Sequence, residues 1–326
     1  MISRETAAVL GSEVKARTPG RSVTDRLFEL ATLACAALVL AVLGAIFLSL
    51  VLGSWQALTR HGLGFLFHAD WDPINGDFGA LAPIYGTLVT SAIAMVVGVP
   101  LSFGIALFIT ELSPRLLRRP LVIAIELLAG IPSIIYGMWG LFVFAPIFGR
   151  YVQPLLHDSL GRLPGLGMLF QGPPMGVGML TAGLILALMI TPFISSVMRE
   201  IFEVVPRALK ESAYAMGATT WEVMIRIVVP QTRIGLVGGI MLGLGRALGE
   251  TMAVTLVIGN AYQISPSLFA PGNTISSVLA NEFSEADDAL YTSSLMELGL
   301  VLFLIAITVL VAARLLLWRL RRNGPG

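Results

Sequence analysis

The stretch PIYGTLVTSAIAMVVGVPLSFGIALFIT, residues 83–110, decides the fold class, because it holds 28 consecutive residues without a charged side chain. A helix that crosses the hydrocarbon core of a bilayer needs about 20 mostly apolar residues. Five further stretches of similar character lie on either side of it. The six predicted spans are roughly 27–54, 83–112, 120–147, 176–198, 235–258 and 293–318.

The composition of the whole chain also indicates a membrane protein. Of its 326 residues, 56% are hydrophobic and only 13% are charged, and the mean hydropathy is +0.85. A typical soluble domain is about 25% charged, so a soluble fold has no means of hiding this much apolar surface. The one cysteine, Cys35, excludes an intrachain disulfide. We therefore expect an all-α membrane protein with six transmembrane helices.

Basic residues are distributed unevenly between the two sides that the predicted spans define. Seventeen lie on the side that holds both termini, three lie on the other side, and Arg246 lies within a span. Because Lys and Arg are enriched in cytoplasmic segments, both termini are expected in the cytoplasm. Residues 1–26 are expected to form a mobile cytoplasmic tail, and residues 27–326 a transmembrane domain with its core at about 83–318.

The cytoplasmic segment 199–235 is expected to form two short helices near the membrane surface. Pro206 suits the first turn of the first helix, and Gly217 suits the turn that follows that helix. Thr219 and Glu222 have the spacing of a capping box, which predicts the start of the second helix. The segment is therefore expected to read as helix, glycine turn, helix.

The same segment carries a spaced motif: Glu211-Ser212-Ala213, then Gly217, then Ile227-Val228-Val229-Pro230, of which Pro230 is expected to end the second helix. This pattern resembles the EAA loop of binding-protein-dependent ABC importers, with Ser212 and Val229 in place of the usual Ala and Leu. The resemblance implies that Glu211, Ser212, Ala213 and Gly217 form a coupling helix that docks on a separate ATPase subunit. An ordinary amphipathic surface helix is the alternative interpretation.

The chain has no nucleotide-binding motif of its own. A P-loop requires a lysine directly after glycine to reach the phosphates, and neither lysine of the chain, Lys15 or Lys210, follows glycine. We therefore expect no cofactor in this chain, with ATP and Mg bound by a partner ATPase. We also expect no catalytic residues. No metal site is expected either, since His61 and His68 lack a third convergent ligand.

Three charged residues within the predicted spans are candidates for a substrate path or gate, because a charge in the bilayer is costly. Glu126 precedes Gly130 and Pro132, which are expected to break or kink the third span. Arg246 and Glu250 are four residues apart and would share a face of one continuous helix. Either this pair only fixes packing, or Arg246 binds an oxyanion and Glu250 holds the guanidinium when the path is empty. Close helix approach is expected at the nearby Gly235, Gly238, Gly239, Gly243, Gly245 and Gly249.

Several stretches resemble phosphate-specific ABC permeases of the PstC type: GLGRALGETMAV at 243–254, ELLAGIPS at 126–133, residues 211–222, and Asn281-Glu282-Phe283. The resemblance covers about 70–322 and implies a type I ABC importer permease fold with phosphate as the substrate. It also implies a heterodimer with a PstA-like permease subunit, two PstB-like ATPase subunits and an external PstS-like phosphate-binding protein. Neither composition nor spacing by itself indicates phosphate.

The predicted external loops are acidic, with eight carboxylates against three basic residues. Such a surface repels a free anion, which fits delivery of the substrate by a binding protein. The carboxylates are Asp70, Asp72, Asp77, Asp158, Glu282, Glu285, Asp287 and Asp288. In the last of these loops, Asn273, Thr274, Ser276 and Ser277 either provide neutral donors at an outer gate or form a plain polar turn.

We therefore expect the membrane-spanning permease subunit of an ATP-driven phosphate importer in the cytoplasmic (inner) membrane of a prokaryote. It would pass inorganic phosphate from an external binding protein to the cytoplasm by alternating access, and it would not be an enzyme. Two alternatives remain: a permease for another oxyanion, such as sulfate or molybdate, and an ion-coupled secondary transporter without an ATPase.

Overall fold

The structure is a computed structural model that describes residues 23–165 and 167–322. The predicted tail 1–26 lies outside the described residues, except that residues 23–26 already belong to a helix. The chain divides into a unit that ends at Ser49 and a unit from Leu50 to Gly326, and each is described by itself. In the described residues, six helical segments are long and apolar enough to cross a membrane: Val23–Gly53, Leu81–Leu112, Ser133–Ser159, Met179–Val204, Thr220–Leu248 and Ala289–Arg319.

The first helix, α2 (Val23–Gly53), carries no charged residue after Glu29. Two hydroxyl groups bond within the helix: Thr32 Oγ1 donates to the Phe28 carbonyl at 2.9 Å, and Ser49 Oγ donates to the Ile46 carbonyl at 2.8 Å. Internal bonding of this kind suits a helix in lipid, where no water is present to satisfy polar groups.

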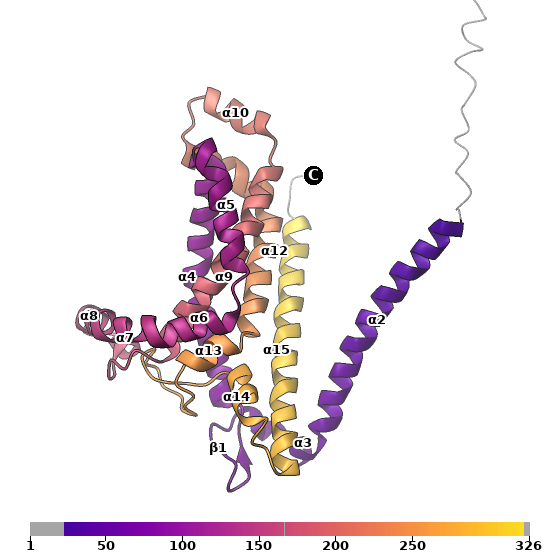
Figure 1. Cartoon of the computed structure of the whole chain (residues 1–326), viewed down its shortest axis with the longest axis vertical. Coiled ribbons are helices and arrows are strands. Elements are labelled where there is room, and N and C mark those ends of the chain that lie inside the picture. Colours follow the sequence, from indigo (N-terminus) through magenta and orange to yellow (C-terminus); the bar gives the residue numbers. More distant parts are fainter. Residues whose placement is uncertain (1–22, 166, 323–326) are drawn as a thin grey trace, which may run out of the picture. The chain divides into compact units, whose positions relative to one another are not determined.

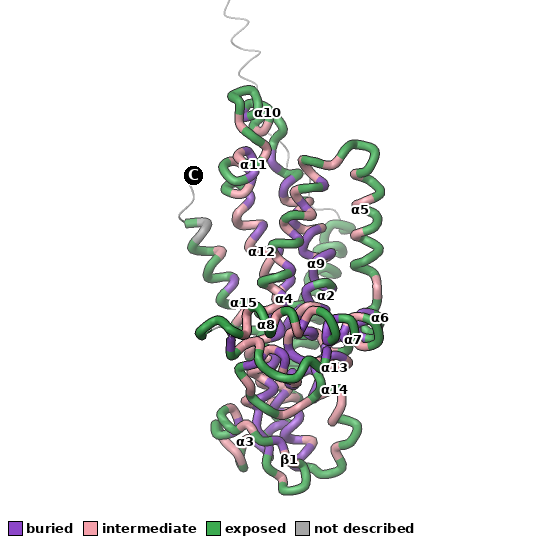
Figure 2. The backbone as a smooth tube through the Cα atoms, turned by 90° about the vertical axis from the view of Figure 1, so that its left-hand side faces the viewer, coloured by how far each residue is buried: buried purple, intermediate pink, exposed green. Residues whose placement is uncertain are grey.

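The second unit is a helical bundle with α9 at its centre (Figure 1). In α9, 67% of the apolar segment is buried, whereas the share in α15 is 6%. Figure 2 shows the same contrast along the two helices. The helices that run side by side are α4 (Leu81–Leu107), α5 (Arg115–Ala129), α9 (Met179–Val204), α12 (Val229–Leu248) and α15 (Ala289–Arg322).

Small residues bring α4 and α9 together. A Cβ at Gly98 of α4 would lie 3.2 Å from the Ile190 side chain, and one at Gly183 of α9 would lie 2.6 Å from Cβ of Ile93. Packing of this kind replaces the hydrophobic effect as the force between helices in lipid. Farther along the same interface, the rings of Phe103 and Phe202 meet edge to face, with their centroids 5.6 Å apart.

The third span differs from the prediction of a helix over 120–147. The helix α5 ends at Ala129, and α6 (Ser133–Trp139) begins after Pro132, so the expected break at the Gly–Pro step is confirmed. From there the chain turns across the bundle through α6, α7 (Ala145–Ile147) and α8 (Gln153–Ser159), as Figure 1 shows. The Tyr136 hydroxyl donates to the Leu128 carbonyl at 2.9 Å and so satisfies one acceptor at the broken end.

The fifth span also differs from its predicted bounds, 235–258. Pro230 does not end a helix, because α11 (Thr220–Val223), the π-helical turn η6 (Met224–Val228) and α12 are continuous. The π turn changes the hydrogen-bond register just before the proline, which lacks an N–H. At its other end α12 stops at Leu248, and the chain resumes helix only at α13 (Met252–Val257). The other four spans are confirmed to within about six residues at each end.

The end of the bundle opposite α10 holds a small compact layer. Strands β1 (Trp71–Asp72) and β2 (Asp77–Phe78) pair antiparallel, with Trp71 opposite Phe78. Oδ1 of Asp72 accepts hydrogen bonds from the backbone of the turn, and Gly76 supplies the positive φ of +71° that the turn needs. These strands pack with the 3-10 turn η1 (Gly62–Leu66), α14 (Ile275–Glu282) and the start of α15 around a second apolar core.

Candidate functional site

The predicted helix, glycine turn and helix are present at one end of the bundle. The first helix is α10 (Arg207–Ala215), which follows Pro206, and Gly217 has a φ of +86°. The predicted capping box at the start of α11 is confirmed, because Thr219 N donates to Glu222 Oε2 at 3.0 Å and Glu222 N donates to Thr219 Oγ1 at 3.3 Å. Helix α10 therefore projects at this end of the bundle (Figure 1), and the turn at Gly217 joins it to α11, the start of the continuous fifth span.

The motif residues of α10 divide between its two faces. Glu211 and Ser212 are exposed, whereas Ala213 is buried against the bundle. The turn after α10 and the start of α11 expose two large apolar side chains, Met216 at 83% and Trp221 at 62%. Exposed aromatic and methionine side chains beside charged groups are typical of a surface that binds another protein.

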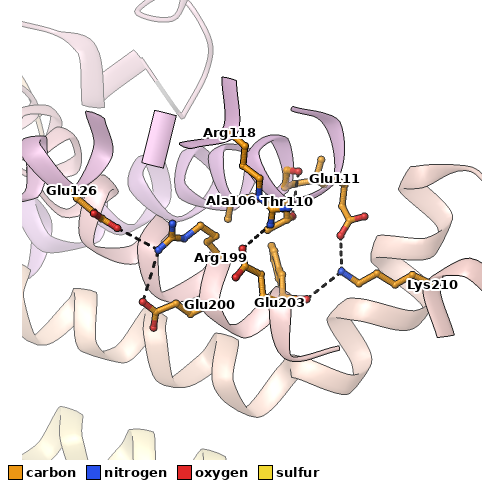
Figure 3. Close-up of polar contacts among 11 residues, drawn as sticks. Ala106, Thr110, Glu111, Arg118, Glu126, Arg199, Glu200, Glu203 and Lys210 are labelled. Atoms are coloured by element: carbon orange, nitrogen blue, oxygen red, sulfur yellow. Dashed lines mark hydrogen bonds and ion pairs between the residues drawn. The ribbon is translucent and has the colours of Figure 1, made fainter. Parts of the chain in front are cut away.

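A groove of about 690 Å³ lies between α10 and the neighbouring ends of α4, α5 and α9. It carries charged side chains from all four segments (Figure 3). Across it, Arg118 of α5 donates to Glu203 of α9 at 2.7 Å. Both of these side chains are partly exposed, at 37% and 49%, so solvent screens the pair and it adds little stability.

A second ion pair in this groove is well shielded from solvent. Lys210 Nζ of α10 lies 2.6 Å from Glu111 Oε1, and the two side chains are only 12% and 11% exposed. Glu111 belongs to η2 (Phe108–Leu112), the π-helical turn that continues α4. Sequence reasoning missed this pair, because its members are 99 residues apart and no local pattern joins them.

Glu126 lies near the end of α5 and pairs with a basic residue of α9. Its Oε1 is 3.5 Å from Nη2 of Arg199, and its side chain is 58% exposed (Figure 3). Arg199 also lies 4.0 Å from Glu200. No hydrogen bond or ion pair joins Glu126 to Arg246 or Glu250, all three of which lie in the described part of the chain.

The prediction that Arg246 and Glu250 share one helix face is wrong. Arg246 lies in the last turn of α12, but α12 ends at Leu248 and Glu250 lies in the break that follows. No ion pair joins the two residues, although both are described. Glu250 Oε1 instead accepts from Ala253 N at 3.4 Å, at the start of α13. The physical reason is that four-residue spacing places two side chains together only in an unbroken helix.

Arg246 is exposed, and its guanidinium carbon lies 5.8 Å from the centroid of the Phe193 ring of α9. Next to it, α6 and α13 pack tightly, since a Cβ at Gly137 would lie 3.0 Å from Cα of Ala253. The two helix breaks, one before α6 and one before α13, thus come together beside a guanidinium.

The glycines of α12 serve two different faces. Gly235, Gly239 and Gly243 approach Ile201, Val197 and Ile194 of α9, which confirms the predicted close contact at these three positions. A Cβ at Gly238 or Gly245 would meet nothing within 4 Å. Leu242, which lies between those two glycines, is 58% exposed. This second face of α12 is therefore uncovered along the stretch that leads to Arg246.

The predicted outer-gate residues form a buried polar cluster. Asn273, Thr274, Ser276 and Ser277 are each at most 5% exposed. The Ser277 hydroxyl donates to Asn273 Oδ1, and Thr274 and Ser277 form a capping box that begins α14. The first backbone N–H of α14, that of Ile275, donates to Thr87 Oγ1 of α4 at 3.0 Å. The cluster thus joins α14 to α4.

Glu282 is the centre of a second polar cluster that sequence reasoning did not assemble. It accepts hydrogen bonds from Tyr262 at 2.5 Å, from Trp71 Nε1 at 3.3 Å, and from the Tyr291 hydroxyl. The rings of Trp71 and Tyr262 stack with their centroids 5.7 Å apart. Burial, followed by the bond to Glu282, raises the pKa of Tyr262 above its usual value of 10.0. The phenol therefore stays protonated in the folded chain. The stability that depends on it is fully present below the ordinary tyrosine pKa of 10.0 and falls as the pH rises from there toward the raised pKa.

Replacing Glu282 with Gln is expected to lower the stability of the chain by about 2 kcal/mol, because three donors would lose a charged acceptor. The midpoint of thermal unfolding of the purified protein measures this. Asp287→Asn, an exposed carboxylate of the same loop, is the control and should leave the midpoint unchanged. Equal midpoints for the two variants would contradict the assigned role of Glu282.

Comparison with known proteins identifies the family. Residues 98–322 match the family described as "Binding-protein-dependent transport system inner membrane component". The chain therefore belongs to this family of transport permeases and is a multi-pass protein of the inner membrane.

The similar proteins define the group within that family. The chain is 59% identical to the phosphate transport system permease protein PstC of Mesorhizobium japonicum, over 92% of this chain and 91% of that protein. It is 57% identical to PstC of Haemophilus influenzae, over 92% and 95% of the two chains. It is also 54% identical to PstC of Xylella fastidiosa, over 99% and 98%. The chain thus falls within the PstC group.

Among solved structures, the fold is similar to that of a chain in the crystal structure of a bacterial alginate ABC transporter bound to its periplasmic protein. The TM-score is 0.62, with 93% of this chain and 97% of that chain covered, at 17% sequence identity. The type I importer permease architecture expected from the sequence is therefore present.

Proposed function

We infer that this chain is the membrane-spanning permease subunit of an ATP-driven phosphate importer, which passes inorganic phosphate from an external binding protein to the cytoplasm. The observation that carries this proposal is the 59% identity to a phosphate transport system permease over 92% of the chain. The projecting helix α10 and the adjoining start of α11, with the exposed Glu211 and Trp221, support a subunit that is driven by a partner.

In this proposal both termini and α10 face the cytoplasm, as the excess of basic residues on that side indicates. Glu211, Ser212, Ala213 and Gly217 would dock on one of two PstB-like ATPase subunits, which would bind ATP and Mg. A PstA-like permease subunit would cover the open face of α12 at Gly238, Leu242 and Gly245, where close helix approach is possible. A PstS-like protein would deliver phosphate at the β1 end.

Arg246 is the residue that we propose to meet phosphate. It is an exposed cation beside two interrupted helices, and interrupted helices free backbone groups that bind ions in many transporters. A guanidinium binds two oxygens of an oxyanion at once. Glu250 and Glu126 would flank the path, and their negative charge would oppose retention of a bound anion. ATP binding and hydrolysis in the partner would alternate access to this path.

An outer gate at Asn273, Thr274, Ser276 and Ser277 would open by separating α14 from α4. The bond from Ile275 N to Thr87 Oγ1 holds these helices together in the present structure. Ser276 Oγ is buried and has no hydrogen-bond partner among the residues that the structure describes. A neutral donor of this kind would be available to a passing anion.

Uptake of radiolabelled phosphate tests the proposed function. Cells that lack this chain are compared with cells in which it is restored, at low external phosphate and with excess sulfate as competitor. We expect restored uptake that survives sulfate and is lost when ATP is depleted while the proton gradient is kept. Competition by sulfate would indicate a permease for another oxyanion, and uptake driven by the gradient alone would indicate a secondary transporter.

A further inference from the structure

The largely shielded pair Lys210–Glu111 connects the projecting helix α10 to the transmembrane core. We propose that this ion pair transmits movement of α10 to α4, and that Lys210 and Glu111 are therefore positioning residues for transport. The proposal rests on the proposed function, because it assumes that a partner moves α10.

The Lys210 side chain joins three segments of the chain. Its Nζ lies 2.6 Å from Glu111 Oε1 in η2 and also donates to the Phe202 carbonyl of α9 at 3.2 Å (Figure 3). Through this one side chain, α10 is bonded to the end of α4 and to the last turns of α9. A shift of α10 thus acts on both central helices of the bundle.

This pair is largely shielded from solvent. With side chains only 12% and 11% exposed, it is less screened by water than an exposed pair, and loss of either partner leaves a largely shielded charge without its counter-charge. The pair Arg118–Glu203 in the same groove is different, since both of its members are partly exposed and solvent competes for them. Of these two pairs, only Lys210–Glu111 has the burial that a mechanical connection requires.

The turn η2, which would be moved by α10 through this ion pair, has a backbone conformation that is suited to rearrangement. Glu111 lies in the π-helical turn η2, and π turns are rare and occur often at functional sites. Beyond this turn, α4 is packed against α9 through Phe103 and Gly98, so a displacement of η2 is passed along the interface. Nearer its start, at Gly86 and Thr87, α4 contacts the proposed outer gate.

The test uses the full complex in proteoliposomes, with phosphate uptake and ATP hydrolysis measured on the same preparation. Glu111→Gln and Lys210→Met are expected to assemble and hydrolyse ATP, while phosphate moved per ATP falls about tenfold, the size of effect that residues coupling two sites can have. Glu203→Gln, which breaks the exposed pair in the same groove, should leave this ratio unchanged.

The double variant Lys210→Glu with Glu111→Lys shows whether the ion pair itself transmits movement or the two side chains only support the local structure. It should restore the ratio to within about threefold of the wild type, because the ion pair is rebuilt but the Phe202 carbonyl loses its donor. An unchanged ratio in the single variants would overturn the proposal. A double variant in which the ratio of phosphate to ATP does not recover would also overturn it. The same holds if the single variants fail to assemble and the double variant does not restore assembly. Failure of the wild-type complex to transport phosphate would instead contradict the proposed function.

Discussion

Replacing Arg246 with Gln is expected to abolish phosphate uptake, lowering it about a hundredfold or more, because two hydrogen bonds from a guanidinium to an anion contribute roughly 1.5–3 kcal/mol each. The complex should still assemble, since the side chain is exposed and its described contact within the chain is the ring of Phe193. Radiolabelled phosphate uptake measures the first expectation, and the yield of the purified complex measures the second.

Two further variants show whether the geometry of the guanidinium matters. Arg246→Lys keeps the charge but loses the planar fork, so uptake should be intermediate. Arg150→Gln is the matched control, because Arg150 also lies over an aromatic ring, that of Tyr151 at 5.5 Å, in another part of the bundle. This control should transport normally. Near-normal uptake by Arg246→Gln would refute the assignment of Arg246 to the substrate path.

The broken helix changes the part that Glu250 is expected to play. Glu250 accepts from Ala253 N and forms no ion pair with Arg246, although both residues are described. The guanidinium is therefore open to an incoming anion without first leaving a carboxylate. Glu250 instead stabilises the start of α13, where a negative charge interacts favourably with the helix dipole.

The features that the sequence predicted correctly depend on local patterns. Each apolar run fixes a membrane span because the bilayer sets the length. The helix, glycine turn and helix around Gly217 are predictable because the capping box of Thr219 and Glu222 needs only residues three apart. The break at Pro132 is predictable because proline restricts its own neighbours.

Other features depend on the tertiary structure and were therefore missed or misplaced. The end of α12 at Leu248 separates Arg246 from Glu250, and nothing in their spacing reveals it. Pro230 lies inside a continuous helix because η6 adjusts the hydrogen bonds before it. The partners of Glu111 and Glu282 come from distant segments, so only the fold places them together.

The contact between α4 and the segment before α14 depends on the absence of a side chain at Gly86. A Cβ at this position would overlap the carbonyl oxygen of Asn273, which is a backbone atom and has no side-chain freedom with which to move away. The adjacent Thr87 accepts from Ile275 N at 3.0 Å, so the two segments are fixed at this distance. An added methyl group therefore breaks this bond or displaces α4.

Gly86→Ala is expected to destabilise the folded chain by about 3 kcal/mol or more, since overpacking of a rigid contact is relieved only by backbone movement. The measurement is the half-life of the detergent-purified protein at elevated temperature, which suits membrane proteins that unfold irreversibly. Gly104→Ala is the matched control in the same helix, because a Cβ there meets nothing within 4 Å. It should leave the half-life unchanged or lengthen it, as alanine is favoured over glycine within a helix by roughly 0.5–1 kcal/mol. If both variants have the half-life of the wild type, α4 and Asn273 are not in the close contact that the structure shows, and the junction proposed as the outer gate lies elsewhere.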